Sequence, residues 1–285
     1  MQYLGVISGP GKRSLSPVFQ QAALDALQLD LVYEHWPTPP DGLAVRVQTL
    51  RSPNVLGANV TIPHKQAIIP LLDETDALAH RVGAVNTVLN QDGRLHGYNT
   101  DVEGFLRALR EDAAFDPRGR RCVIAGAGGA ARAVVVALQE AAASEVTIVN
   151  RTLARAEGLL AELNAEGDAW LRALPDTPDA WREALEGAGL LVNCTSLGAA
   201  GTPEENDSPV AADLISPDLL VYDLVYVPAE TSLLRAAQAR SARTLGGLPM
   251  LIYQGAASFR IWTDRDPPLD TMFKAAQAAL AEAAA

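Results

Sequence analysis

A glycine-rich turn near the middle of the chain constrains the fold more than any other stretch. Residues 126–132, Gly-Ala-Gly-Gly-Ala-Ala-Arg, follow a strand-like run at 122–125 and precede a helix-like run at 133–141. Glycines permit a tight turn and a close backbone approach, and a helix that starts after a strand can hold a pyrophosphate at its N-terminus. The turn therefore predicts a βαβ unit that binds a dinucleotide. The predicted backbone contacts are Gly126, Ala127, Gly128, Gly129 and Ala130.

Strand-like and helix-like runs alternate on both sides of this turn. Apolar strand-like runs occupy residues 3–7, 31–34, 57–60, 84–89, 121–125, 146–150, 190–194 and 220–224. Helix-like runs occupy residues 17–27 and 41–50, start again near 102, and end the chain at 272–284. This alternation predicts an α/β protein with mostly parallel sheets, and 285 residues suggest roughly two domains.

The strand after the glycine turn ends in residues that bear on the choice of cofactor. Asn150, Arg151 and Thr152 end that strand, and Arg155 follows one helical turn later. A site for NAD usually has an acidic residue here, whereas two arginines four residues apart are expected to face the same side of a helix start. Guanidinium groups match phosphate geometry, so the pair predicts the 2′-phosphate of NADP. The alternative is two arginines on a solvated helix face.

A second group of polar residues lies in the first hundred. In the stretch 59–65, Asn-Val-Thr-Ile-Pro-His-Lys, Pro63 favours extended geometry before it and predicts a strand end that turns into a helix. A further polar run, Asn-Thr-Asp, ends in Asp101. A lysine beside an aspartate is a plausible proton-transfer pair, which makes Lys65 and Asp101 candidates. On the motif alone, a surface lysine after a turn remains the alternative.

Taken together, these motifs resemble the shikimate dehydrogenase family nearly end to end. The matching stretches are 14–17, 59–65, 83–87, 97–101 with Gly104, 126–132, 150–152, 193–196, 222–228, 246–254, 258–259 and Trp262. The resemblance implies two α/β domains around a cleft, the second a Rossmann-type doubly wound parallel sheet. It implies a discontinuous substrate-binding catalytic domain, residues 1–102 plus 248–285, and an NADP-binding domain, residues 103–247.

The resemblance also implies an activity and a set of site residues. The activity is the NADP-linked, reversible reduction of 3-dehydroshikimate to shikimate, a step of chorismate and aromatic amino acid biosynthesis. The family's catalytic pair matches Lys65 and Asp101. Substrate-binding positions match Ser14, Ser16, Asn59, Thr61, Asn86, Tyr226 and Gln254. Further cofactor positions match Asn150, Arg151, Thr152, Arg155, Thr195, Gly246 and Met250.

The chemistry of the residues agrees with this activity. Reduction of a ketone by hydride needs a proton at the new alkoxide, and a positioned lysine can deliver it or stabilise the negative charge. Asp101 is expected to orient the ammonium group of Lys65 and to accept a hydrogen bond from a substrate hydroxyl. Both roles of Lys65 stay open at this point.

Several of these positions have a structural alternative. Ser16 precedes a proline at an expected helix start, where serine is a good N-cap, and capping explains Ser16 without a ligand. Gln254 lies in an apolar helix-like run, where backbone groups can satisfy it, and Met250 is core by default. Arg13 stands where many family members have a histidine, which leaves fine substrate preference open.

Composition excludes several classes of partner. A net charge of −11 argues against nucleic acid or an anionic membrane as partner, and no apolar run approaches a membrane span. The N-terminus lacks the features of a signal peptide, and Cys122 and Cys194 lie in strand-like runs without metal-ligand spacing. We therefore expect a cytoplasmic protein with buried, reduced thiols, no metal and a small-molecule substrate. A monomer and a homodimer are equally compatible with the sequence.

Two other functions compete with this prediction. A quinate/shikimate dehydrogenase with relaxed substrate or NAD use is the nearer one, and the two arginines argue against NAD preference. The other is a non-catalytic nucleotide-binding regulator, which would be expected to have lost Lys65 or Asp101.

Overall fold

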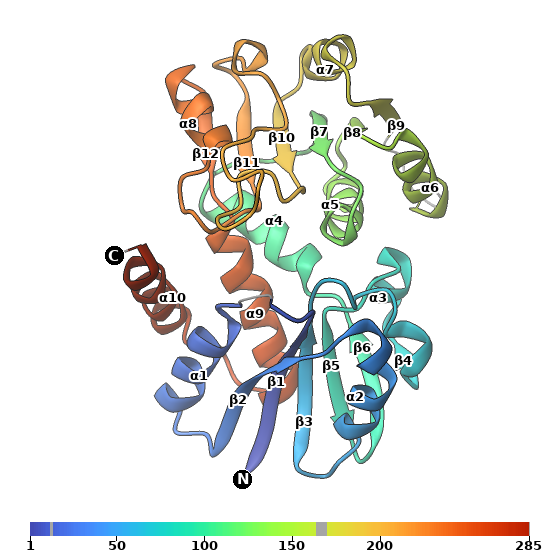
Figure 1. The fold of residues 1–285 in the computed structure, drawn as a ribbon, viewed down its shortest axis with the longest axis vertical. Coiled ribbons are helices and arrows are strands. Elements are labelled where there is room, and N and C mark those ends of the chain that lie inside the picture. Colours follow the sequence, from blue (N-terminus) through green and yellow to red (C-terminus); the bar gives the residue numbers. More distant parts are fainter. Residues whose placement is uncertain (12–13, 164–169, 285) are drawn as a thin grey trace. The chain divides into compact units, whose positions relative to one another are not determined.

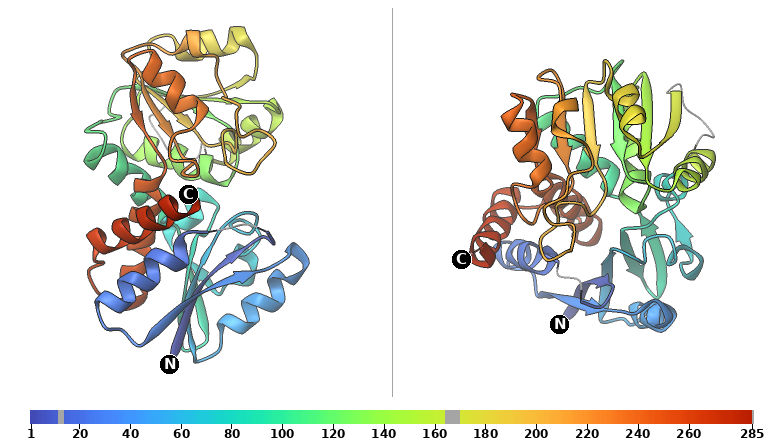
Figure 2. Two further views of the ribbon diagram at one scale, coloured as in Figure 1. Left: turned by 60° about the vertical axis from the view of Figure 1, so that its left-hand side comes forward. Right: turned by 45° about the horizontal axis from the view of Figure 1, so that its top comes forward.

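A computed structural model describes residues 1–11, 14–163 and 170–284. The chain divides into two compact units (Figure 1). Unit 1 comprises Met1–Gly104 and Ile252–Ala285, and unit 2 comprises Phe105–Leu251. Each unit is built on a six-stranded sheet with helices against it, so the predicted α/β class is confirmed (Figure 2).

The sheet of unit 1 is mixed, with three parallel and two antiparallel pairs of neighbouring strands. Its strands are β1 (Gln2–Ser8), β2 (Leu31–Pro37), β3 (Val55–Val60), β4 (Glu74–Thr75), β5 (Thr87–Gln91) and β6 (Arg94–Tyr98), in the order β2-β1-β3-β5-β6-β4. Strand β5 runs antiparallel to both β3 and β6, while the other neighbours are parallel. Strands β5 and β6 are joined by the two-residue turn Asp92–Gly93, whose φ angles of 52° and 87° are those of a tight hairpin.

Helices of unit 1 lie against both faces of this sheet. They are α1 (Ser16–Ala26), α2 (Leu43–Leu50), α3 (Ala77–Val82) and α10 (Leu269–Ala284), with the start of α4 (Asp101–Glu111) and most of α9 (Leu248–Thr263). Successive residues of β3 point to opposite faces. Ala58 and Val60 join the apolar core that includes Leu50 of α2, whereas Gly57 and Asn59 face α9. The face to which Asn59 points is thus set by its position in β3.

Unit 2 contains the predicted Rossmann-type sheet. Its strands are β7 (Arg121–Ala125), β8 (Glu145–Asn150), β9 (Trp170–Pro175), β10 (Leu190–Asn193), β11 (Leu220–Asp223) and β12 (Arg243–Leu245), in the order β12-β11-β10-β7-β8-β9. All neighbouring strands are parallel. The order reverses direction between β7 and β10, and in such sheets ligands bind at the carboxyl ends of the strands at this switch point.

The helices of unit 2 bury the strands on both faces. They are α5 (Gly129–Glu140), α6 (Leu153–Leu163), α7 (Pro178–Leu185) and α8 (Ser232–Ala239). One apolar cluster joins the central strands to α7 and α8 through Val123, Leu191, Val221, Trp181 and Leu234. Because these strands are covered on both sides, they read as continuous apolar runs in the sequence.

One predicted element is absent. Residues 61–68 form turns instead of the helix expected near Pro63, and the next regular element is a 3₁₀ turn at Ile69–Leu71. The carbonyl oxygen of Lys65 accepts a hydrogen bond from the Val85 N–H at 2.8 Å, so this backbone is paired across the unit rather than within a helix. At the glycine turn the opposite holds, since α5 begins at Gly129, earlier than the predicted 133.

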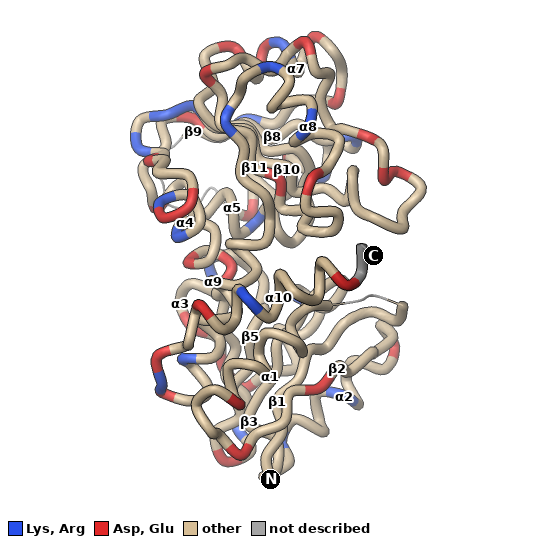
Figure 3. The backbone as a smooth tube through the Cα atoms, turned by 90° about the vertical axis from the view of Figure 1, so that its left-hand side faces the viewer, with Lys and Arg blue, Asp and Glu red and all other residues tan. Residues whose placement is uncertain are grey.

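The net charge of −11 comes from acidic residues that are spread over the chain. Acidic residues occur along both units, as Figure 3 shows. Within residues 1–11, 14–163 and 170–284, no helix is long and apolar enough to cross a membrane.

Candidate active site

The turn that carries Lys65 is held by backbone bonds to neighbouring segments. The Thr61 N–H donates to the Ile7 carbonyl at 2.9 Å, and the Gly9 N–H donates to the Ile62 carbonyl at 3.0 Å. The imidazole Nε2 of His64, which is 1 % exposed, lies 2.8 Å from the carbonyl oxygen of Thr38. Because that oxygen can only accept, Nε2 carries a proton and donates it. His64 therefore anchors the turn, and the side chain of the next residue, Lys65, points toward Asp101.

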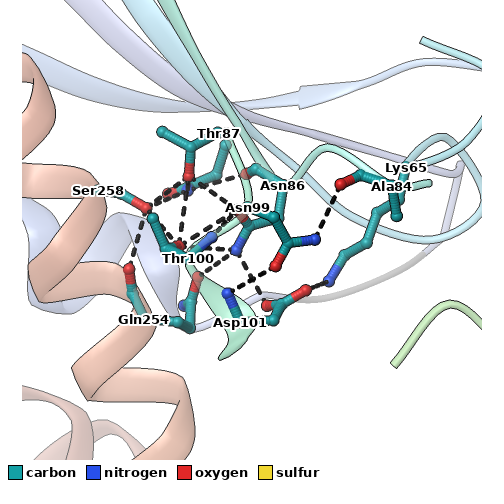
Figure 4. A network of polar contacts seen from close by, with 10 residues as sticks. Lys65, Ala84, Asn86, Thr87, Asn99, Thr100, Asp101, Gln254 and Ser258 are labelled. Atoms are coloured by element: carbon teal, nitrogen blue, oxygen red, sulfur yellow. Dashed lines mark hydrogen bonds and ion pairs between the residues drawn. The ribbon is translucent and has the colours of Figure 1, made fainter. Parts of the chain in front are cut away.

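Lys65 and Asp101 form the predicted pair. Nζ of Lys65 lies 2.6 Å from Oδ2 of Asp101, and the two side chains are only 16 % and 5 % exposed (Figure 4). Asp101 is the first residue of α4, where a carboxylate is favoured by the helix dipole. Its backbone N–H donates to Oδ1 of Asn99 at 3.0 Å, and Asn99 is fixed in turn by the Ala84 carbonyl.

Asn86 holds the other oxygen of Asp101. It follows α3, which ends at Gly83 in the left-handed conformation, and it precedes β5. Its Nδ2 donates to Oδ1 of Asp101 at 2.9 Å and lies 3.2 Å from Oε1 of Gln254. Its Oδ1 accepts the backbone N–H of Thr100 at 2.8 Å, and this backbone donor fixes which way the amide points. Lys65, Asp101, Asn86 and Gln254 are thus brought together.

Asn59 lies deeper in the same network. Its Oδ1 accepts the phenol of Tyr33 at 2.7 Å, and its Nδ2 reaches Oγ of Ser258 at 3.0 Å and the Asn86 carbonyl at 3.2 Å. The side chain is buried, with the residue 5 % exposed. The structure therefore places Asn59 beside the predicted substrate residues, with its amide already engaged inside the protein.

The two serines near the N-terminus behave differently from expectation. Helix α1 begins at Ser16, with Leu15 as its cap residue, so the predicted N-cap role of Ser16 is wrong. Instead Oγ of Ser14 accepts the backbone N–H of Ser16 at 3.1 Å. The reason is the turn before the helix, which lets the side chain of the earlier serine reach forward to the first helical N–H. Arg13, for which the sequence leaves the effect on substrate preference open, lies outside the described residues.

Four residues of this network carried no predicted role. They are Tyr33, Thr87, Thr100 and Ser258, whose hydroxyl groups link β2, β5, the start of α4 and α9. Thr87, Thr100 and Ser258 fall within matched motifs, but Tyr33 has no local signal. Its partner Asn59 lies 26 positions away, so only the fold reveals the contact.

In unit 2 the glycine turn has the form that a pyrophosphate requires. Gly126 adopts a φ of 96°, and a Cβ atom there would lie 2.8 Å from Cγ2 of Thr195. Gly128 caps α5, and a Cβ atom there would meet nothing within 4 Å. The turn is thus closed against the protein at Gly126 and open at Gly128, in front of the first N–H groups of a helix. These residues fit a dinucleotide.

A buried carboxylate supports the neighbouring loop. Asn193 accepts hydrogen bonds from both the N–H and the hydroxyl of Thr195, and its Nδ2 donates to Oδ1 of Asp223 at 2.9 Å. The hydroxyl of Thr231 donates to Oδ2 of Asp223 at 2.6 Å. Burial raises the pKa of Asp223, while these hydrogen bonds act to lower it. The ends of β10 and β11 are thereby tied together, which fixes Thr195 against the glycine turn.

The two arginines follow strand β8, Arg151 directly after it and Arg155 in the first turn of α6. Helix α6 begins at Leu153, so Arg151 belongs to the turn before it, and the predicted shared helix face is wrong for Arg151. Nδ2 of Asn150 closes this turn by donating to the Thr152 carbonyl at 2.7 Å. Both guanidinium groups are exposed, and among the described residues neither forms an ion pair. They are available for an anionic ligand.

The remaining predicted positions in unit 2 are Tyr226, after β11, Gly246, after β12, and Met250, which is buried in the first turn of α9. Burial raises the pKa of the Tyr226 phenol. Both cysteines are free thiols, and burial raises the pKa of Cys122 to about 12 and that of Cys194 further, so neither is a nucleophile at neutral pH. In the described part of the chain, no group of three or more His, Cys, Asp or Glu residues could hold a metal ion.

Fold and site together define a class. The chain combines a Rossmann-type sheet and an open glycine turn with a buried lysine–carboxylate pair among amides and hydroxyls. These features are those of a dinucleotide-dependent oxidoreductase of two α/β units.

Comparisons with known proteins give the family. The model of the shikimate dehydrogenase substrate binding domain matches residues 6–88, that of shikimate/quinate 5-dehydrogenase matches 109–196, and that of the shikimate 5′-dehydrogenase C-terminal domain matches 247–281. The shikimate dehydrogenase (NADP(+)) of Methanopyrus kandleri is 45 % identical over 95 % of this chain and 93 % of its own. The chain belongs to the shikimate/quinate dehydrogenase family.

Solved structures agree. Shikimate 5-dehydrogenase from Thermus thermophilus, in complex with NADP(H) and shikimate, has a TM-score of 0.87 at 40 % identity, covering 98 % of this chain and 100 % of its own. Quinate dehydrogenase from Corynebacterium glutamicum, in complex with NAD, has a TM-score of 0.88 at 29 % identity, covering 97 % and 99 %.

Proposed function

We propose that this chain catalyses the NADP-dependent, reversible reduction of 3-dehydroshikimate to shikimate. The observation that carries the proposal is the contact of 2.6 Å between Lys65 and Asp101, whose second oxygen is held by Asn86. The curated relatives that match over nearly the whole chain at 39–45 % identity are named shikimate dehydrogenases (NADP(+)), which supports the same substrate here.

Unit 1 would bind the substrate. Lys65 would transfer the proton of the hydroxyl group that becomes the ketone, and Asp101 would hold the ammonium group and accept from a second hydroxyl. The substrate contacts we propose are Ser14, Ser16, Asn59, Thr61, Asn86, Tyr226 and Gln254. Asp101 suits this task because both of its oxygens are oriented before substrate arrives, which lowers the cost of ordering the site.

Unit 2 would bind NADP, which supplies the hydride chemistry. The N–H groups at the start of α5 would hold the pyrophosphate next to Gly128, where the turn is open. Arg151 and Arg155 would bind the 2′-phosphate, because both residues are exposed and follow the end of β8, Arg151 in the turn and Arg155 in the first turn of α6. Asn150, Thr152, Thr195, Gly246 and Met250 complete the proposed cofactor contacts.

A direct assay tests the proposal. Purified enzyme, shikimate and NADP⁺ should produce NADPH, measured by its absorbance, and 3-dehydroshikimate should consume NADPH in the reverse direction. Enzyme that is folded but shows no NADPH formation with shikimate would refute the proposed function and would favour a nucleotide-binding regulator.

The second candidate is a quinate/shikimate dehydrogenase that uses NAD. The likeness to a quinate dehydrogenase at a TM-score of 0.88 favours it, whereas the two arginines oppose it. The same assay with quinate and with NAD⁺ separates the candidates. We expect kcat/KM to be highest for the pair of shikimate and NADP⁺.

A further inference from the structure

Tyr33 is a buried titratable residue to which the proposed mechanism gives no task. It lies in β2, is 5 % exposed, and its ring packs against Trp262 of α9 with centroids 6.1 Å apart. Strand β1 separates β2 from β3, yet the phenol reaches over it and donates to Oδ1 of Asn59 at 2.7 Å. Burial raises the pKa of this phenol well above its usual value, and the smaller opposing effect is a hydrogen bond with Ser16. The hydroxyl group therefore remains a donor throughout the neutral range.

This hydrogen bond decides which way the Asn59 amide points. With Oδ1 turned toward Tyr33, Nδ2 faces the Asn86 carbonyl at 3.2 Å and Oγ of Ser258 at 3.0 Å. If the amide turned over, its oxygen would face the Asn86 carbonyl oxygen, and two acceptors would meet without a proton. In the observed arrangement both polar atoms of the amide have a partner, and among the described residues the phenol is the only donor to Oδ1.

The contacts continue from Asn59 to the catalytic pair. Oγ of Ser258 lies 2.7 Å from the hydroxyl of Thr87 and 3.1 Å from that of Thr100. Nδ2 of Asn86 donates to this Thr100 hydroxyl at 2.8 Å and to Asp101 at 2.9 Å. Asp101 in turn binds Lys65 (Figure 4). An unbroken set of hydrogen bonds thus joins a phenol on β2 to the carboxylate proposed to serve catalysis.

We propose that Tyr33 is a positioning residue of the substrate site, which acts through Asn59 to set the orientation of the Asn86–Asp101 group. This inference rests on the proposed function, because it concerns the binding of the same substrate. It goes beyond that function in giving the reaction a residue that touches neither substrate nor cofactor. Because Tyr33 and its partners lie in unit 1, loss of its hydroxyl should weaken the binding of shikimate and leave the binding of NADP⁺ unchanged.

The test is Tyr33→Phe, which removes one hydroxyl and keeps the ring against Trp262. We expect KM for shikimate to rise about tenfold, equivalent to about 1.4 kcal/mol, with KM for NADP⁺ unchanged. The matched control is Tyr98→Phe, which removes a hydroxyl from β6 of the same sheet. In the described part of the chain the Tyr98 hydroxyl makes no hydrogen bond, so this variant should behave like the wild type.

A double-mutant cycle tests the route. If Tyr33 acts through Asn59, adding Tyr33→Phe to Asn59→Ala should change KM for shikimate no further. Independent, multiplying effects of the two substitutions would overturn the route. A merely structural role would raise both Michaelis constants together, so a parallel rise in KM for NADP⁺ also counts against the inference.

Failure of this inference can be told from failure of the proposed function. An active wild type whose Tyr33→Phe variant keeps a normal KM for shikimate refutes only the role of Tyr33. A wild type with no shikimate turnover refutes both. Should Asn59→Ala not fold, the comparison of Tyr33→Phe with Tyr98→Phe still decides, since both are losses of a single oxygen atom.

Discussion

Replacing Lys65 by methionine is the most direct perturbation of the proposed chemistry. Methionine keeps an unbranched, flexible side chain of similar length but has no charge and no donor. The substitution removes the contact of 2.6 Å to Asp101 and leaves that carboxylate, whose side chain is 5 % exposed, with Asn86. Removal of one partner from a fully buried ion pair lowers the free energy of unfolding by about 3–5 kcal/mol. Because the lysine side chain is 16 % exposed, we expect a loss of about 2 kcal/mol here.

The effect on turnover follows from what the ammonium group does. Proton transfer by a positioned side chain contributes about 10²–10⁴-fold, and loss of one electrostatic stabiliser of an oxyanion costs about 10²–10³-fold. We therefore expect kcat of Lys65→Met to fall at least about 100-fold. KM for shikimate should stay close to that of the wild type, because Asp101 and Asn86 remain to bind hydroxyl groups. This pattern is the mark of an interaction made in the transition state.

Steady-state NADP⁺ reduction at varied shikimate concentration measures both constants. The chain has only three lysines, Lys12, Lys65 and Lys274, which makes a matched control possible. Lys274 is exposed on α10, so Lys274→Met should be fully active. A kcat of Lys65→Met within about tenfold of the wild type would refute the reasoning, since neither role in catalysis is worth so little.

Lys65→Arg distinguishes the two roles that the sequence leaves open. Arginine keeps the positive charge but does not give up a proton near neutral pH. We expect Lys65→Arg to be as slow as Lys65→Met, because the proposed role is proton transfer. Substantial activity in Lys65→Arg would instead assign the lysine to charge stabilisation.

Three further outcomes follow from particular contacts. The double variant Arg151→Ser/Arg155→Ser should raise KM for NADP⁺ about tenfold or more and leave KM for NAD⁺ nearly unchanged, in kinetics with both cofactors. Gly57→Ala should lower the thermal unfolding midpoint, since its Cβ would overlap a β5 carbonyl oxygen and the indole of α9, and overpacking costs about 1–3 kcal/mol. A hydrogen bond from Arg51 lowers the pKa of Asp73, and a hydrogen bond from a backbone N–H lowers it by a smaller amount. The Asp73 carboxylate therefore stabilises the fold above the usual carboxyl pKa, and this stabilisation is lost as pH falls through the pKa of the folded state. Asp73→Asn should reduce the decrease in the free energy of unfolding at acidic pH, measured by unfolding at a series of pH values.

The Rossmann-type unit could be read from the sequence because its signals are local. Strand 121–125 is found at its predicted bounds, and the glycine turn lies between that strand and α5 as expected. Each of these signals needs only a few adjacent residues. The unit 1 sheet was harder, since the prediction of a strand at 84–89 overlooked β6 and the Asp92–Gly93 turn that makes β5 and β6 a hairpin. That signal was present, and a two-residue Asp-Gly loop predicts antiparallel strands.

The site divides in the same way. Lys65 and Asp101 lie 36 positions apart, and their meeting was predicted from chemistry and from the family resemblance. The contacts beneath them could not be predicted, because Asn59 joins Tyr33 and Ser258 across 26 and 199 positions. A buried polar side chain must find partners somewhere, but composition and periodicity do not say which. Only the register of β3 against β1 and α9 decides it.

Some residues of the site keep unused donors or acceptors and can contact a ligand, whereas others are fully engaged and hold their neighbours in place. An ammonium group has three donors, and in the described part of the chain that of Lys65 uses one, on Asp101. The half-buried hydroxyl of Thr61 makes no hydrogen bond there. The amide of Asn59, by contrast, has its oxygen and its nitrogen engaged within unit 1. Lys65 and Thr61 therefore retain capacity for substrate, whereas a bond from Asn59 to substrate would require one of its internal bonds to lengthen or break. The proposed contact of Asn59 with substrate would therefore share the amide with its internal partners, and the Tyr33 phenol keeps that amide oriented.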